Sequence, residues 1–214
     1  MITLEGIDRA ETIRYLGNSR VNMNEDMSAL LDSCEKELLR HIEVKYLYKT
    51  VPAENSPLIS GSDIRAHLKD CDKAVIMCAT LGREVDRIIK IAQITDMSRA
   101  VVLDAMASSA IESVCARLEK QIARENTGRY LTWRFSPGYG DYPIELQSLY
   151  LSLLDAPRKI GLCANQSSML IPTKSVTAII GLSEKPVENR RRGCATCSLA
   201  GECKFRKAGK RCEF

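Results

Sequence analysis

The residues best suited to chemistry form one stretch, R-F-S-P-G-Y-G-D-Y, at residues 134–142. An arginine guanidinium binds a carboxylate through two parallel hydrogen bonds, and Arg134 would stand beside a loop whose backbone amides are available to a ligand. A proline fixes one backbone dihedral of this loop, while Gly138 and Gly140 permit the positive φ of a tight bend. The same residues also fit a plain strand-to-helix turn with Pro143 as the first helical residue. Residue types alone therefore leave a binding loop and a structural turn open.

A second set of chemically capable residues lies near the C-terminus. Its four cysteines follow the spacing C-x2-C-x5-C-x8-C and are Cys194, Cys197, Cys203 and Cys212. Four closely spaced thiolates can hold one metal centre. Four-cysteine zinc sites usually show two C-x2-C pairs, whereas an iron–sulfur cluster tolerates irregular spacing. We expect these thiolates to bind metal, with an iron–sulfur cluster favoured over zinc.

The same tail is the basic part of the chain. Residues 188–214 contain eight Lys or Arg against three Glu, a balance of +5, and the whole chain carries +4. The first 187 residues therefore sum to −1, which does not suit a nucleic-acid-binding surface. Only Phe205 and Phe214 could stack on bases in the tail, so we expect its charges to offset metal-bound thiolates instead.

Length and composition indicate a globular protein. A chain of 214 residues that is 45% hydrophobic can bury a sizeable core. No apolar run of about 18 residues could cross a bilayer, and the first residues lack the pattern of a secretory signal. The other cysteines are scattered through the chain, as in proteins of a reducing compartment. We expect a cytoplasmic protein without a membrane partner.

Periodicity predicts the elements that must position these residues. An apolar stripe from Met27 to Leu38 has helical spacing, and the apolar run at 74–79 is typical of a buried strand. Residues 105–110 are mostly small and would let another element approach a long helix, on which Glu112 also lies. The elements expected before the central loop are helices at 7–17, 27–38, 83–94 and 97–124, a short helix capped by Ser62, and strands at 44–51 and 74–79.

The central loop is expected between a strand and a helix. Residues 129–135 alternate polar and apolar side chains like a half-buried strand. A helix should follow the loop, with strands at 168–171 and 175–182. The residues expected to face the core are Leu131, Trp133 and Phe135 in the first strand and Leu146, Leu149, Tyr150 and Leu153 in the helix.

Helices and strands are mixed without regular βαβ alternation, so we expect an α+β fold. Its sheet should be largely antiparallel, twisted and flanked by helices. We expect residues 1–187 to form this domain and residues 188–214 to form a short Cys-rich, metal-binding appendage.

Two motifs resemble the activation domain of cobalamin-dependent methionine synthase, which binds S-adenosylmethionine (AdoMet). R-F-S-P-G-Y is similar to the R-x-x-P-G-Y signature of that family. Gln166-Ser167, Pro172 and Ser175-Val176-Thr177 are similar to its second motif, a Glu-Ser pair followed by P-x-x-S-V-S. The sequences R-Y-L-G at 14–17 and A-T-L-G at 79–82 resemble small stand-alone members. The resemblance covers roughly residues 5–185.

The resemblance implies roles for particular residues. Arg134 would hold the methionyl carboxylate of AdoMet, Ser136 and Gly138 would contact the ligand from the loop, and Tyr139 would approach the corrin. Ser175 belongs to the second motif. The sequence departs from the family at Gly128 and Gln166, which stand where the family has acidic residues, and at Ser108, where the family has the acid of the long helix; Glu112 lies one turn further on.

The implied function is a stand-alone reactivation module for a cobalamin-dependent methionine synthase or another corrinoid protein. Such a module places the methyl group of AdoMet in line with the cobalt of the partner's cobalamin, a positioning role that needs no catalytic base. The electron would come through the metal tail from a ferredoxin or flavodoxin. The alternatives are an AdoMet-binding regulatory sensor with a structural zinc tail and, less favoured, a nucleic-acid-binding protein.

Overall fold

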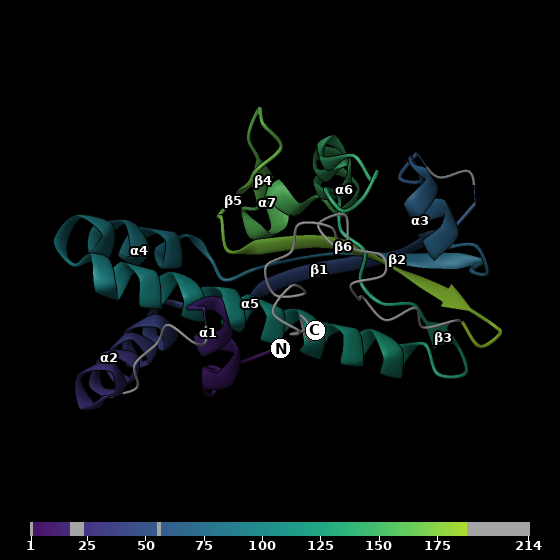
Figure 1. The fold of residues 1–214 in the computed structure, drawn as a ribbon. Coiled ribbons are helices and arrows are strands. Elements are labelled where there is room, and N and C mark those ends of the chain that lie inside the picture. Colours follow the sequence, from purple (N-terminus) through teal and green to yellow (C-terminus); the bar gives the residue numbers. More distant parts are fainter. Residues whose placement is uncertain (1, 18–23, 55–56, 188–214) are drawn as a thin grey trace. The chain divides into compact units, whose positions relative to one another are not determined.

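The computed structural model describes residues 2–17, 24–54 and 57–187, which form helices and strands in mixed order (Figure 1). The helices are α1 (Arg9–Tyr15), α2 (Glu25–His41), α3 (Ser62–His67), α4 (Arg83–Thr95), α5 (Met97–Glu125), the 3₁₀ helix η2 (Ile144–Leu146), α6 (Gln147–Leu154) and α7 (Ala156–Ile160). The strands are β1 (Lys45–Pro52), β2 (Lys73–Thr80), β3 (Tyr130–Leu131), β4 (Cys163–Ala164), β5 (Leu170–Ile171) and β6 (Ser175–Ser183).

The chain divides into two compact units. Unit 1 contains residues up to 49 together with 77–127 and 145–177. Unit 2 contains 50–76, 128–144 and the described residues from 178 onward. The boundary expected at residue 187 stays a prediction, because residues 188–214 lie outside the described part.

Four of the strands form one sheet in the order β1-β2-β6-β3. β3 runs antiparallel to β6, with Tyr130 opposite Ser183 and Leu131 opposite Leu182. The α+β fold with an antiparallel sheet flanked by helices is therefore confirmed. The strand expected at 168–171 is shorter than predicted, and it pairs with β4 in a separate two-stranded sheet. Neither β4 nor α7 was predicted, since both are very short.

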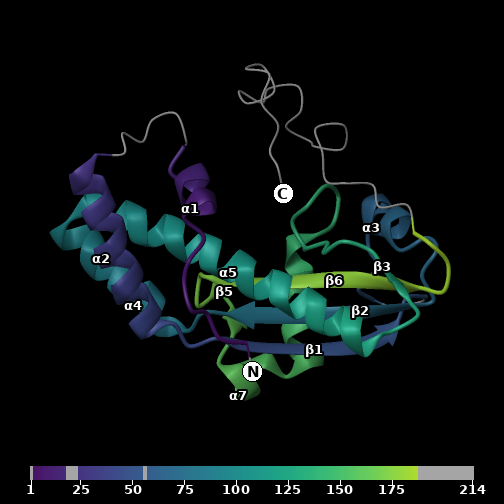
Figure 2. The same cartoon turned by 90° about the horizontal axis from the view of Figure 1, so that it is seen from below.

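The helical part of unit 1 is built around α5, which packs against α1, α2 and α4 (Figures 1 and 2). Asp96 separates α4 from α5, and its side chain caps α5 by accepting a hydrogen bond from the Arg99 amide. Asn24 caps α2 in the same way. The predicted stripe of α2 is confirmed in part, with Leu31 and Leu38 fully buried.

The strand predicted at 129–135 is interrupted. Pairing with β6 begins at β3. At Thr132, the backbone amide donates to the Gly181 carbonyl, but the Gly181 amide donates at 2.7 Å to the Thr132 side-chain oxygen Oγ1 and not to a backbone carbonyl. Pairing resumes at Phe135, which exchanges two backbone hydrogen bonds with Ile179. Phe135 is buried as expected, whereas Leu131 and Trp133 are only half-buried.

The core-facing side of α6 differs from the prediction by one residue. The buried residues are Gln147, Tyr150, Leu151 and Leu154, whereas Leu153 is exposed. The reason is a polar anchor: Gln147 accepts a hydrogen bond from the Thr177 hydroxyl at 2.9 Å and donates to the Ser168 carbonyl at 3.1 Å. A hydrophobic pattern cannot identify a glutamine that faces inward.

Helix α3 in unit 2 also differs from its prediction. Its N-cap position is Gly61, at φ 114°, and no side chain of the cap residue bonds to the helix. Ser62 is instead the first helical residue. Its amide donates to the carboxylate of Asp141, a residue far away in sequence.

Candidate functional site

The loop at residues 136–142 is a closed turn of unit 2. The Gly138 amide donates to the Tyr142 carbonyl at 2.8 Å, and the Tyr142 amide donates to the Tyr139 carbonyl at 2.9 Å. Gly138 has φ 94° and Gly140 has φ 54°, so both positions suit glycine better than a residue with a side chain. The structure thus confirms the expected glycine-dependent bend.

Aromatic side chains support this loop from beneath. The ring of Phe135 lies 5.7 Å from that of Tyr142 and 5.0 Å from that of Trp133. Tyr142 is 1% exposed, and its hydroxyl donates to the Leu58 carbonyl at 2.8 Å. Tyr139, by contrast, is 50% exposed. The loop therefore has a buried base and an accessible tip.

A pair of aspartates joins the end of the loop to α3. Asp141 accepts hydrogen bonds from the Ser62 hydroxyl and from the Ser62 and Asp63 amides, while the Asp141 amide donates to the Asp63 carboxylate. These bonds, that of the Ser62 hydroxyl above all, lower the pKa of Asp141 below its ordinary value. Asp141 is therefore a carboxylate at neutral pH.

His67 of α3 is a further residue of this region that sequence reasoning left without a role. Its Nε2 lies 2.8 Å from the Thr132 hydroxyl, and its ring packs edge-on against Trp133 at 4.5 Å. Helical periodicity alone gave no signal for these contacts, because Thr132 and Trp133 are far from His67 in sequence.

The structure brings four of the predicted ligand-binding residues together in this loop region and places two in unit 1. Arg134, Ser136, Gly138 and Tyr139 lie in unit 2, with Arg134 half-buried directly before the loop. Ser175 begins β6 in unit 1; its hydroxyl donates to the Pro172 carbonyl at 2.7 Å and lies 2.8 Å from the Thr80 hydroxyl. Glu112 is half-buried on α5.

Glu112 has a titratable neighbour on α1. Burial raises the pKa of Tyr15, and the negative charge of Glu112 raises it further. The guanidinium carbon of Arg14 lies 4.6 Å from the centre of the Tyr15 ring, a cation–π contact. Arg14 and Tyr15 belong to the R-Y-L-G motif, so this motif and Glu112 are neighbours in unit 1.

The small-residue segment of α5 is covered by other parts of unit 1. The Ser109 hydroxyl donates to the Asp8 carbonyl at 3.1 Å, at the start of α1. Lys174 reaches the other side, where its ammonium group lies 2.8 Å from the Asp104 carboxylate and 3.0 Å from the Ser108 hydroxyl. Close approach to this segment, expected from its small side chains, is therefore confirmed.

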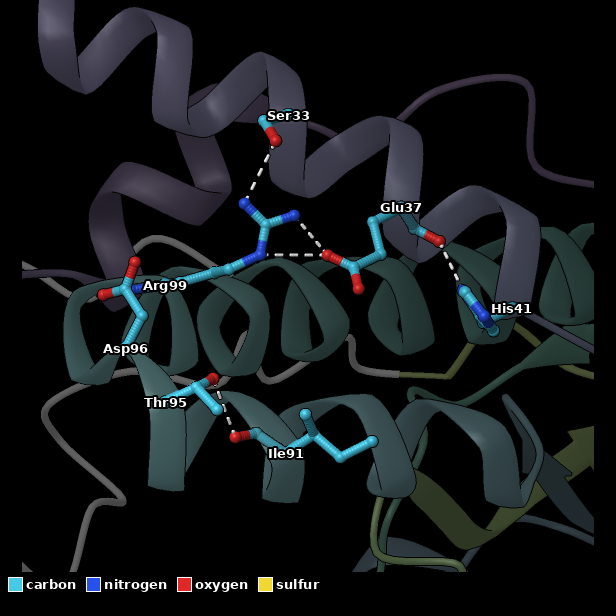
Figure 3. Close-up of polar contacts among 7 residues, drawn as sticks. All are labelled: Ser33, Glu37, His41, Ile91, Thr95, Asp96 and Arg99. Atoms are coloured by element: carbon cyan, nitrogen blue, oxygen red, sulfur yellow. Dashed lines mark hydrogen bonds and ion pairs between the residues drawn. The ribbon is translucent and has the colours of Figure 1, made fainter.

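A shallow cavity of about 260 Å³ lies beside this segment, between α1, α4 and α5. It is lined by Tyr15, Leu16, Gln93, Met97, Ala100, Val101, Asp104, Ala105 and Ser108. Near this cavity, Arg99 ties α5 to α2 through hydrogen bonds to Glu37 and to the Ser33 hydroxyl (Figure 3). The bond to Glu37 also raises the pKa of Arg99.

The five cysteines of the described residues are free thiols, and four of them are buried. Burial raises the pKa of Cys34 and Cys71 to about 11 and that of Cys78 to about 12. These thiols stay protonated and behave as small apolar side chains. No group of three or more metal-binding side chains occurs in the described residues. The predicted ligands Cys194, Cys197, Cys203 and Cys212 lie outside them.

Searches of known protein families and of curated proteins find no match to the chain. A solved structure does match: the crystal structure of the MetH reactivation domain bound to AdoHcy. The TM-score is 0.54 at 16% sequence identity, over 94% of this chain and 74% of that one. The fold is similar to that of the MetH reactivation domain. At this identity the likeness concerns the reactivation-domain fold alone. Within the described residues, no helix is long and apolar enough to cross a membrane.

Proposed function

We propose that this chain is a stand-alone AdoMet-binding module that supports the reactivation of a corrinoid protein, with a cobalamin-dependent methionine synthase as the first candidate partner. The observation that carries the proposal is the R-F-S-P-G-Y segment at residues 134–139, which leads into the closed turn at 136–142 on a fold similar to that of a domain that binds AdoHcy. AdoHcy is AdoMet without its transferable methyl group, so the two share the carboxylate and the nucleoside.

The loop residues fit such a ligand. Arg134 would hold the carboxylate, because a guanidinium matches it with two hydrogen bonds. Gly138 is exposed and has no side chain to hinder an approaching ligand, and its positive φ is one that glycine adopts readily. Tyr139, half exposed at the tip, would meet the partner's corrin. AdoMet supplies an activated methyl group, and the residues of this chain bind and orient it.

Glu112 and Ser175, the two other residues that the resemblance suggests as ligand contacts, lie in unit 1. Their part in AdoMet binding is proposed from the sequence motifs alone. Ser175 would hold the backbone of residues 172–175 in place without touching the ligand, since its hydroxyl already donates to the Pro172 carbonyl. No acid–base residue is needed for a role that consists of binding and orientation.

Titration calorimetry with AdoHcy and AdoMet tests the binding. The native protein should bind both, and Arg134→Ala should abolish binding while the circular dichroism spectrum and melting temperature stay unchanged. Arg124→Ala removes an exposed arginine of α5 and is the matched control. Binding by Arg134→Ala as tight as that of the native protein would show that the site lies elsewhere.

Reactivation is tested separately, with a methionine synthase that lacks its own activation domain and has been oxidised to cob(II)alamin. Adding this protein, AdoMet and reduced flavodoxin or ferredoxin should restore methyl transfer. AdoMet binding without restored activity would instead support the alternative of a regulatory sensor.

The Cys-rich tail at 188–214 is proposed, from its sequence alone, to bind an iron–sulfur cluster that passes an electron to the partner's cobalt, with zinc as the alternative. Anaerobically purified protein should be brown and contain iron and sulfide. A colourless protein with stoichiometric zinc would contradict the electron-transfer role. The scattered cysteines elsewhere in the sequence support a cytoplasmic location.

A further inference from the structure

The loop that carries the proposed ligand contacts is fastened at two points within unit 2. Its first fastening is the pair of backbone hydrogen bonds between Phe135 and Ile179, at 2.8 and 2.9 Å. Its second is Asp141, which bonds to the start of α3. Ser136, Gly138 and Tyr139 lie between the two fastenings, so the shape of this short segment depends on both.

The second fastening is reciprocal. One oxygen of Asp141 accepts from the amide and the hydroxyl of Ser62, both at 2.6 Å, and the other accepts from the Asp63 amide at 3.0 Å. In return, Asp63 accepts from the Asp141 amide at 3.1 Å. Bonds to a charged acceptor are stronger than neutral ones, and here they come from two segments in both directions.

Two glycines make this approach possible. A Cβ atom on Gly61 would lie 2.6 Å from an oxygen of the Asp141 carboxylate and 2.8 Å from its backbone carbonyl. A Cβ atom on Gly140 would overlap the Asp63 carboxylate. Both glycines also have positive φ, of 114° and 54°. Each segment therefore lacks a side chain where the other places its carboxylate.

This exchange of hydrogen bonds between Asp141 and residues 62–63 adds little buried apolar surface to the core. Ser62, Asp63, Gly140 and Asp141 are all exposed, so the contact buries little apolar surface. Exposed hydrogen bonds of this kind determine where a segment lies more than how stable the fold is. The buried support of the loop comes instead from Tyr142 and Phe135.

We propose that Asp141 and Asp63 are positioning residues that hold the 136–140 segment in its ligand-binding shape. This inference rests on the proposed function, because it concerns the same ligand. Without the exchange, the segment would have to be ordered when AdoMet binds, and the cost of that ordering would appear as weaker affinity.

The test compares Asp141→Ala with Asp141→Asn and with the control Asp70→Ala, which removes an exposed acid of the same unit. Calorimetry should show AdoHcy affinity weakened about tenfold in Asp141→Ala. Asp141→Asn should recover only part of the affinity, since the asparagine oxygen can replace one of the two accepting carboxylate oxygens while its NH2 group cannot accept from the donors facing the other. Asp70→Ala should bind like the native protein, and all variants should melt within a few degrees of it.

Hydrogen exchange measured by mass spectrometry gives a readout that needs no ligand. Asp141→Ala should exchange faster at residues 136–142 and at the start of α3, and Asp70→Ala should not. Native-like affinity in Asp141→Ala would overturn the inference while the proposed function stands. A native protein that does not bind AdoHcy would overturn the proposed function, and the positioning role would fall with it.

If Asp141→Ala fails to fold, Ser62→Ala replaces it, because this change removes only the hydroxyl bond to Asp141. It should weaken AdoHcy binding less than loss of the whole carboxylate would, but more than Asp70→Ala. Affinity in Ser62→Ala equal to that of the native protein would then overturn the inference.

Discussion

The central loop of unit 2 and the small-residue segment of α5 in unit 1 are held in place by opposite means. The loop ends in an exposed exchange of hydrogen bonds between Asp141 and α3. The α5 segment lies in a buried environment, where Ser109 is 0% exposed and bonds to the Asp8 carbonyl. Buried packing contributes most of the stability of a fold, whereas exposed polar contacts mainly fix local geometry. Changes in the two regions should therefore affect different measurements.

The largest effect on stability is expected from the core of unit 1. Leu38 of α2 is 0% exposed, and Leu38→Ala should lower the free energy of unfolding by about 2–5 kcal/mol, because it removes buried methyl groups and leaves a cavity. Urea denaturation measures this loss. AdoHcy affinity of the folded variant should stay within about twofold of the native value. Leu39→Ala, at the half-buried neighbouring position, is the control and should cost less stability. If Leu38→Ala lowered AdoHcy affinity as strongly as it lowers stability, the comparison between the two regions would be wrong.

A smaller loss of stability is expected when a larger side chain is placed in a filled space of each unit. Ser109→Leu in α5 and Gly181→Ala in β6 each place new atoms in a filled space and should cost about 1–3 kcal/mol. A Cβ atom on Gly181 would meet Cys71, Leu68 and Thr132. Since Thr132 is two residues before Arg134, we expect only Gly181→Ala to weaken AdoHcy binding.

Denaturation and calorimetry on both variants, with Ser98→Leu as the exposed control on α5, test this prediction. Weaker AdoHcy binding in Ser109→Leu than in Gly181→Ala would reverse the assignment of binding and stability to the two regions.

The smallest effect concerns pH. Hydrogen bonds lower the pKa of Asp141 and Asp72 in unit 2 below the ordinary 3.8; the main causes are Ser62 and Arg129, respectively. The pKa of Glu84 in unit 1 is likewise lowered from 4.5 by Arg87. A carboxyl group whose pKa falls on folding stabilises the fold above its unfolded pKa, and this contribution is lost as the pH falls through the folded value.

The melting temperature should therefore stay level from neutral pH to about pH 5 and fall below about pH 4. Arg129→Met should reduce the acid-dependent part, because it removes the main cause of the lowered pKa of Asp72. A melting temperature that rises on acidification from pH 5 to pH 3 would contradict the sign of this effect.

Periodicity predicted most helices and long strands because their patterns are local. The stripe of α2 and the apolar run of β2 each identify an element without reference to the rest of the chain. The errors arose where a distant partner decides the outcome. Gln147 faces inward because Thr177 and Ser168 satisfy its amide, and Thr132 interrupts a strand because its hydroxyl bonds to Gly181.

The candidate site shows the same limit. The glycine-bent loop after Arg134 could be predicted, since proline and glycine restrict the backbone locally. The role of Asp141 could not, because the amides that it binds are 78 and 79 residues away. A Gly-Asp pair in a loop gives no sign of which segment its carboxylate reaches. The tail cysteines, outside the described residues, stay a prediction.

The division of the chain has a consequence for protein synthesis. Each unit is assembled from three separate stretches, and three of the five boundaries fall inside β1, β2 and β6. A nascent chain that has emerged only as far as residue 144 lacks the last stretch of both units. No single cut can therefore release either unit intact, and the ribosome must deliver nearly the whole described sequence before either can close.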